Sequence, residues 1–155
     1  MRNVADWLGE YGQSHADPTN KFLHWVCVPL IVLAVMGLLW SIPVPAEIEA
    51  VSPWLNWATL TAVLALVYYA ALSIRLALGI AVAFVLMFAI VSALTALAWP
   101  LWATSLAIFI AAWIGQFIGH ASEGKRPSFF KDVQFLLIGP LWLVAAVYRS
   151  LHIQY

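Results

Sequence analysis

Residues 76–99 read LALGIAVAFVLMFAIVSALTALAW and contain no charged side chain. A continuous apolar run of this length can cross a bilayer as one helix, since about 20 helical residues span the hydrocarbon core. The run does not alternate between polar and apolar residues, and lipid requires a backbone whose hydrogen bonds are satisfied internally. The stretch therefore predicts a transmembrane helix and an all-α fold.

Four further apolar stretches complete the pattern, and the five segments expected to be helical are 22–41, 54–73, 76–99, 101–119 and 133–151. Before them, residues 1–20 contain an apolar stripe at helical spacing, which predicts a short amphipathic helix lying in the membrane interface. We therefore expect one domain over residues 1–155, an integral membrane bundle of four to five transmembrane helices with an N-terminal interfacial helix.

The last apolar segment is interrupted by Gly139-Pro140, and a proline inside a helix removes a hydrogen bond and kinks the chain. If this segment spans the membrane fully, Arg149 and His152 emerge on the far side. If it bends back or tilts, both return to the side where it started. The sequence leaves these two alternatives open.

Composition supports the membrane assignment and excludes one class of partner. The chain is 65% hydrophobic and only 9% charged, whereas soluble domains contain roughly 25% charged residues. Its formal net charge is zero, so no basic surface for nucleic acid is expected. The single cysteine, Cys27, lies in an apolar run and is expected to be an inert small hydrophobe.

The placement of basic residues orients the predicted bundle. Five basic residues before the last segment fall on one side of the membrane: Lys21, Arg75, Lys125, Arg126 and Lys131. Prolines, glutamates and several tryptophans fall on the other. Basic residues favour the cytoplasmic side, so we expect the N-terminus and the 121–132 loop to face the cytoplasm from a bacterial inner membrane or the endoplasmic reticulum.

Three histidines fall on this same side, each near a helix end. Asn20 precedes His24 by four residues and Gln116 precedes His120 by four, so each pair shares a helix face. Polar groups at the edge of a membrane are costly and are usually functional. Two or three imidazoles that leave positions open are typical of a non-haem iron site. His15, His24 and His120 are therefore the candidate metal ligands.

Other polar residues admit more than one role. A histidine at a helix end is also commonly just an interfacial residue, and His152 is the weakest candidate for the metal. Glu123 could be a ligand, a hydrogen-bond acceptor behind the ligands, or an ion-pair partner of Lys125. Lys125 and Arg126 could steer an acidic substrate, although the orientation rule already accounts for them. Gly115-x-x-x-Gly119 could allow close helix approach.

Two motifs together resemble a known family. They are Tyr11-x-x-x-His15-x-Asp17-Pro18-x-Asn20-x-x-x-His24-x-x-x-x-Pro29 and Gln116-Phe117-Ile118-Gly119-His120-x-x-Glu123-Gly124-x-x-Pro127. The pair is similar to the membrane family of 2-hydroxy fatty acid dioxygenases, whose eukaryotic members act in phytosphingosine degradation. The later Gly139-Pro140 segment matches as well, so the resemblance covers nearly the whole chain.

The resemblance implies an Fe(II)-dependent α-oxidation, in which a 2-hydroxy fatty acid and O₂ give a fatty acid one carbon shorter. It also implies that His15, His24 and His120 bind Fe(2+). Three further positions match the polar partners of the motifs: Asn20, Gln116 and Glu123. The chain departs from the family pattern at Cys27, where glycine is usual, and at Ser122, where an aromatic residue is common.

Two other functions compete with this interpretation. A bis-histidine haem protein would use His24 and His120 as axial ligands and would show a Soret band. A non-enzymatic membrane carrier or lipid-packing protein would bind no transition metal. The sequence also leaves open the substrate chain length, the number of metal ions, and whether the chain forms a homo-oligomer.

Overall fold

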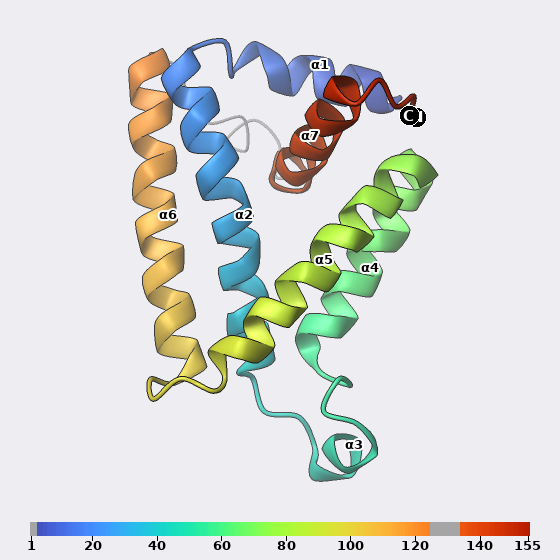
Figure 1. Cartoon of the computed structure of the whole chain (residues 1–155), viewed down its shortest axis with the longest axis vertical. Coiled ribbons are helices and arrows are strands. Elements are labelled where there is room, and N and C mark those ends of the chain that lie inside the picture. Colours follow the sequence, from blue (N-terminus) through green and yellow to red (C-terminus); the bar gives the residue numbers. More distant parts are fainter. Residues whose placement is uncertain (1–2, 125–133) are drawn as a thin grey trace.

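The computed structural model describes residues 3–124 and 134–155, and all regular secondary structure in those residues is helical (Figure 1). The helices are α1 (Val4–Gln13), α2 (Pro18–Trp40), α3 (Ala46–Val51), α4 (Trp57–Leu72), α5 (Ile74–Leu94), α6 (Leu101–Glu123) and α7 (Phe135–Ser150). Among them α2, α5 and α6 are long and apolar enough to cross a membrane, and α4 and α7 are shorter apolar helices. The expected all-α bundle is confirmed.

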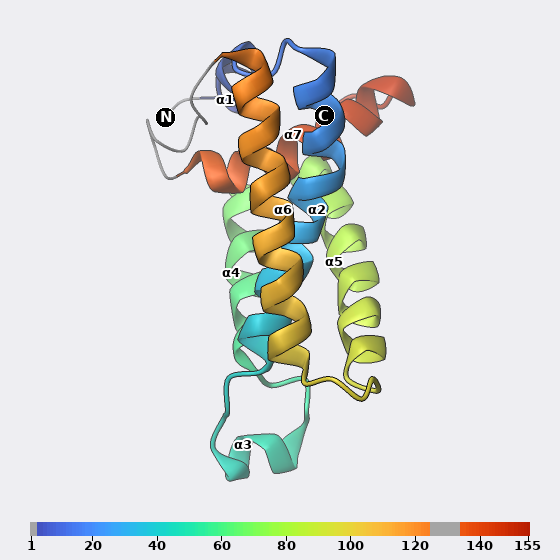
Figure 2. The same cartoon turned by 90° about the vertical axis from the view of Figure 1, so that its left-hand side faces the viewer.

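Helices α2 and α6 lie side by side and form the most extensive helix pair of the bundle (Figures 1 and 2). Two glycines of α6 make their close approach feasible. A Cβ atom on Gly119 would lie 2.7 Å from Asn20 Oδ1, and one on Gly115 would lie 2.6 Å from Cys27 Sγ. The expected close approach at the G-x-x-x-G sequence is therefore confirmed, and Cys27 fills the space that Gly115 leaves.

Helix α2 begins at Pro18, four residues before the apolar segment predicted from residue 22. Asp17 accepts a hydrogen bond from the backbone N–H of Asn20 at 2.9 Å, and Pro18 occupies the first helical position. This hydrogen bond from Asn20 is the main reason that the pKa of the Asp17 carboxyl lies below its usual value. At the same end of the bundle, α6 continues to Glu123, beyond the predicted 119, and Gly124 ends it with a left-handed φ of 67°.

Helix α7 runs crosswise to α2 and α6 at the end of the bundle where α1 lies (Figure 2). Its apolar face is buried, with Ile138 and Leu141 both 0% exposed, and Phe135 packs edge-on against Trp7 of α1 at 5.3 Å. Beyond α7 the chain returns to the α4–α5 hairpin, where Arg75 Nη1 donates to Gln154 O at 3.2 Å. Of the two alternatives for this segment, the structure therefore has the tilted one.

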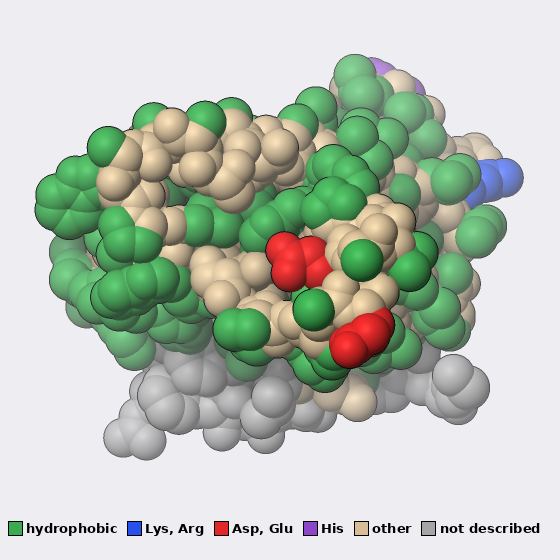
Figure 3. All heavy atoms as spheres, turned by 90° about the horizontal axis from the view of Figure 1, so that it is seen from below, with side chains coloured by type: hydrophobic (Ala, Val, Ile, Leu, Met, Phe, Trp, Pro, Cys, Tyr) green, Lys and Arg blue, Asp and Glu red, His purple; other side chains and the backbone are tan. Residues whose placement is uncertain are grey.

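The opposite end of the bundle contains an element that was not expected. Residues 42–53, which connect the first two apolar segments and contain three prolines, include the short helix α3. Pro45 precedes its first turn, and Glu47 and Glu49 within that turn complement the positive end of the helix dipole. Figure 3 views the molecule from this end and shows acidic side chains among hydrophobic ones.

Candidate metal centre

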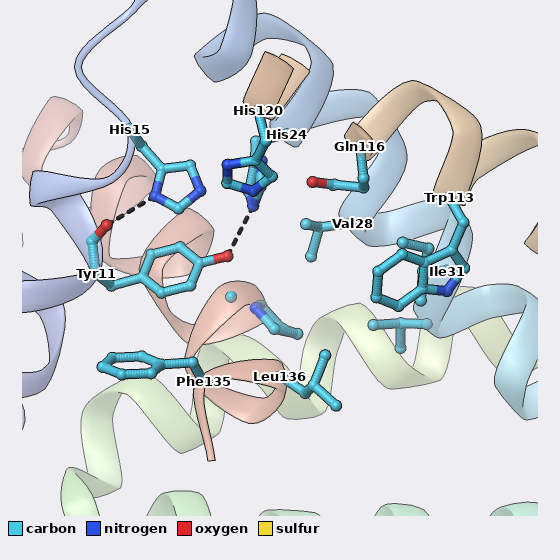
Figure 4. Close-up of a pocket in the computed structure, with 13 residues that line it drawn as sticks. Tyr11, His15, His24, Val28, Ile31, Trp113, Gln116, His120, Phe135 and Leu136 are labelled. Carbon is cyan, nitrogen blue, oxygen red and sulfur yellow. Dashed lines mark hydrogen bonds between the residues drawn. The ribbon is translucent and has the colours of Figure 1, made fainter. Parts of the chain in front are cut away.

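Three histidines from separate parts of the chain meet at the α1 end of the bundle (Figure 4). His15 lies in the connection between α1 and α2, His24 lies in α2, and His120 lies near the end of α6. They are 1%, 3% and 5% exposed. Each offers a ring nitrogen, and these atoms all lie within 4.8 Å of one another. Residues more than a hundred positions apart thus form one buried cluster of imidazoles.

The connection between α1 and α2 fixes the ring of His15. Its Nδ1 lies 2.7 Å from the backbone carbonyl oxygen of Tyr11, and its ring stacks on the Tyr11 ring at 4.3 Å. A carbonyl oxygen only accepts hydrogen bonds, so Nδ1 carries the proton and Nε2 keeps its lone pair. That is the tautomer in which Nε2 can bind a metal ion.

Asn20 and Glu123 hold the same connection against α2 and α6. Glu123 accepts hydrogen bonds from Ala16 N–H at 2.8 Å and from Asn20 Nδ2 at 2.6 Å. Asn20 Nδ2 also donates to Ser14 O at 3.1 Å. Glu123 thus accepts hydrogen bonds that tie α6 to the segment carrying His15, and its predicted alternative partner, Lys125, lies outside the described residues.

Tyr11 contacts His24 as well, a role that the sequence analysis did not assign. Its hydroxyl oxygen lies 2.7 Å from His24 Nε2, and burial raises the pKa of the phenol above its usual value. The available signal was the spacing of four residues between Tyr11 and His15, which places both on one side of a helical turn. Tyr11 therefore packs against one histidine and hydrogen-bonds another.

The cluster fits a transition-metal ion. Nδ1 of His24 and Nδ1 of His120 are buried and have no hydrogen-bond partner within residues 3–124 and 134–155. Leaving such groups without a partner is unfavourable, and a bound cation would satisfy them. Metal–imidazole bonds of about 2.0–2.1 Å place two ligand nitrogens at most about 4 Å apart. Small side-chain rotations would close the observed separation, and imidazole donors suit iron, zinc, copper and nickel.

A cavity of about 60 Å³ adjoins the three imidazoles. Tyr11 and Gln116 line it together with apolar side chains of α2, α6 and α7. Gln116 is 5% exposed, and its side-chain oxygen points toward the imidazoles in Figure 4. Its Nε2 has no hydrogen-bond partner among the residues that the structure describes. The cavity thus offers the ring nitrogens and one amide to a small polar group.

The remaining predicted residues lie elsewhere. His152 is exposed, has a φ of 55°, and does not belong to the histidine cluster. Lys125 and Arg126 lie outside the described residues. Arg149 lies in the last turn of α7, where Nη1 donates to Tyr155 Oη at 2.7 Å.

Fold and site together define an all-helical protein with membrane-length helices and a buried cluster of three histidines that could bind a metal ion. A family model matches residues 1–151, and the chain belongs to that family, described as 2-hydroxy-palmitic acid dioxygenase Mpo1-like. No curated protein and no solved structure matches the chain significantly. The family suspected from the two histidine motifs is therefore confirmed.

Proposed function

We propose that the protein is a non-haem iron dioxygenase that shortens 2-hydroxy fatty acids by one carbon. The observation on which this mainly rests is the convergence of three buried imidazoles beside a small cavity. The family name supports the substrate class and the use of O₂. We place the site at the cytoplasmic face of the membrane, because the sequence places most basic residues on the same side of the membrane as the three histidines.

The proposed reaction is R–CH(OH)–COOH + O₂ → R–COOH + CO₂ + H₂O. The C1–C2 bond breaks, C1 leaves as carbon dioxide, and the electrons lost by C1 and C2 reduce dioxygen. A ferrous ion held by His15, His24 and His120 would supply the means to bring dioxygen and substrate together and to transfer these electrons.

Residues around the site orient the histidine ligands and the substrate. Asn20 and Glu123 fix the segment that carries His15, and Tyr11 fixes the ring of His24. The Gln116 amide faces the cavity, where it can hydrogen-bond the carboxyl or 2-hydroxyl group of the substrate. The apolar walls exclude bulk water, which strengthens each of these polar contacts.

The geometry does not favour the haem alternative. The ring centroid of His15 lies 4.0 Å from that of His24 and 5.1 Å from that of His120, so a third imidazole adjoins the two rings that would be axial ligands. The cavity of about 60 Å³ is also far smaller than the roughly 300–1,000 Å³ of pockets for larger ligands.

Metal analysis and an oxygen-uptake assay on the detergent-purified protein test the proposal. We expect iron without a Soret band, and oxygen uptake that depends on a 2-hydroxy fatty acid and stops when iron is removed. His24→Ala and His120→Ala should lose bound iron and all turnover while remaining helical. The matched change His152→Ala should leave both unchanged, because this exposed residue lies outside the cluster. A folded, fully active His120→Ala protein would overturn the ligand assignment.

A further inference from the structure

A second, larger cavity adjoins the histidine site within the bundle. It has a volume of about 360 Å³ and is lined by residues of α2, α4, α5, α6 and α7. Its walls share five residues with the histidine cavity: Ile31, Val32, Trp113, Leu136 and Pro140. The two cavities therefore adjoin along a common wall.

The second cavity is almost wholly apolar. Only Thr61 and Tyr69 contribute side-chain hydroxyls to its lining, and the Tyr69 hydroxyl donates to Leu137 O at 2.9 Å. The histidine cavity is too small for a lipid, whereas the second has the size typical of ligand pockets, about 300–1,000 Å³. The small cavity thus presents polar groups that suit the head of a fatty acid, and the larger one presents apolar walls that suit its hydrocarbon chain.

Along both α2 and α6, the residues that line the second cavity extend away from the histidines. On α2 its lining runs from Ile31 to Leu39, progressively farther from His24, and on α6 it continues to Phe109. At about 1.5 Å of rise per residue, Leu39 lies about 22 Å from His24 along α2, and Phe109 lies about 16 Å from His120 along α6. Against a hydrocarbon core of about 30 Å, the lining extends from a helix end to about the middle of the bilayer or beyond.

We propose that this apolar chamber holds the hydrocarbon chain of the substrate, and that residues at its far end limit the chain length. The inference rests on the proposed function, because the histidine site is taken to hold the carboxyl and 2-hydroxyl groups. Met36 and Leu39 of α2 and Ala58 of α4 form the far end. Each methylene that enters the chamber contributes about fourfold in affinity.

Small residues on the inner face of α4 leave the chamber open. Ala58 is 1% exposed and lies at the far end, and Ala65 lines the same wall two turns nearer to Tyr69. A phenylalanine at either position would occupy space that an acyl chain needs. Ala71 is exposed on the same helix and lines neither cavity, so Ala71→Phe is the matched control.

The test measures binding and turnover separately across saturated 2-hydroxy acids from medium to very long chain. Binding to the metal-free protein is followed by displacement of a fluorescent fatty acid, and turnover of the iron-loaded protein by oxygen uptake. Ala58→Phe should lower the longest chain that binds well, and Ala65→Phe should lower it further, with about fourfold loss per excluded methylene. Met36→Ala should extend the range to longer chains, which a folding defect would not do.

The outcomes separate this inference from the proposed function. If the acids bind with the expected chain-length limits but no oxygen is consumed, the chamber is supported and the proposed reaction fails. If 2-hydroxy acids are oxidised but neither Ala58→Phe nor Met36→Ala moves the limit in a folded protein, the chamber assignment is overturned. An equal shift in Ala71→Phe, or affinity that keeps rising with chain length without a limit, as in partitioning into a bilayer, would also overturn it.

Discussion

The two ends of the α2–α6 pair are built in opposite ways. At the histidine end, polar side chains are buried and bonded across the chain, as in the contact of Asn20 with Glu123. At the other end, α3 contains no buried residue, and side-chain hydrogen bonds among the described residues, such as that from Trp57 Nε1 to Pro43 O at 3.3 Å, join residues close in sequence. Because buried polar groups are costly, their concentration at one end indicates where specific chemistry is located.

The largest effect should come from forcing α2 and α6 apart at the histidine end. In Gly119→Ala, the new Cβ would meet Asn20 Oδ1 at 2.7 Å and the Asn20 Cα at 3.4 Å. We expect a loss of about 1–3 kcal/mol in stability, as for other overpacked sites, together with loss of bound metal. Thermal unfolding in detergent and metal analysis measure both effects.

The control for this change is Gly9→Ala in α1. A Cβ on Gly9 meets no atom within 4 Å, so the same substitution should be neutral or stabilising by up to about 1 kcal/mol through helix propensity. If Gly119→Ala behaved like Gly9→Ala and kept its metal, close contact of the two helices would not be needed for the site.

The next effect should come from Glu123, which bonds the His15 segment from α6. Glu123→Ala removes the acceptor for Ala16 N–H and for Asn20 Nδ2. Loss of partners that orient metal ligands typically costs about 10–100-fold in metal affinity, and we expect a weakening in that range, measured by competition with a chelator. Glu47→Ala in α3 is the counterpart at the opposite end and should leave the affinity unchanged. Equal effects from both would show that Glu123 acts only through overall charge.

Much of this contrast could be predicted from the sequence. The apolar runs gave the helices, because lipid permits few other backbone conformations. Asp17 and Pro18 are typical of the first positions of a helix, and α2 begins there. The four-residue spacings placed His24 and His120 on the same helix faces as the amides of Asn20 and Gln116. The histidine cluster was expected because the antiparallel order of helices brings the start of α2 and the end of α6 to one side.

Other features depend on contacts that local sequence does not encode. The path of α7 is set by packing of residues such as Ile138 and by the contact of Arg75 with Gln154 O. The hydrogen bond between Tyr11 and His24 depends on how α1 folds back over α2. The apolar chamber arises from five helices together, and no single hydrophobic run distinguishes its lining from a surface that faces lipid.

A smaller effect should follow from Tyr11→Phe. The change keeps the ring that stacks on His15 and removes only the hydroxyl that contacts His24 Nε2 at 2.7 Å. One such hydrogen bond contributes about 1 kcal/mol, so we expect metal affinity to fall about fivefold. Tyr148→Phe is the control, since its hydroxyl bonds Arg75 O at the α4–α5 hairpin. If Tyr11→Phe bound metal as tightly as the unmodified protein, the hydroxyl would have no part in holding His24.

The smallest effect on the site should come from the aromatic cluster at the opposite end. Trp54 packs edge-on against Trp40 at 5.1 Å and lies 6.1 Å from Phe88. Trp54→Ala should cost about 0.5–1.5 kcal/mol of stability for each aromatic pair lost, measured by thermal unfolding. Metal affinity and oxygen uptake should stay unchanged, because no polar contact joins Trp54 to the histidines. Release of metal from this variant would mean that α2 and α6 transmit packing changes along their whole length, and the two ends could then no longer be treated as independent.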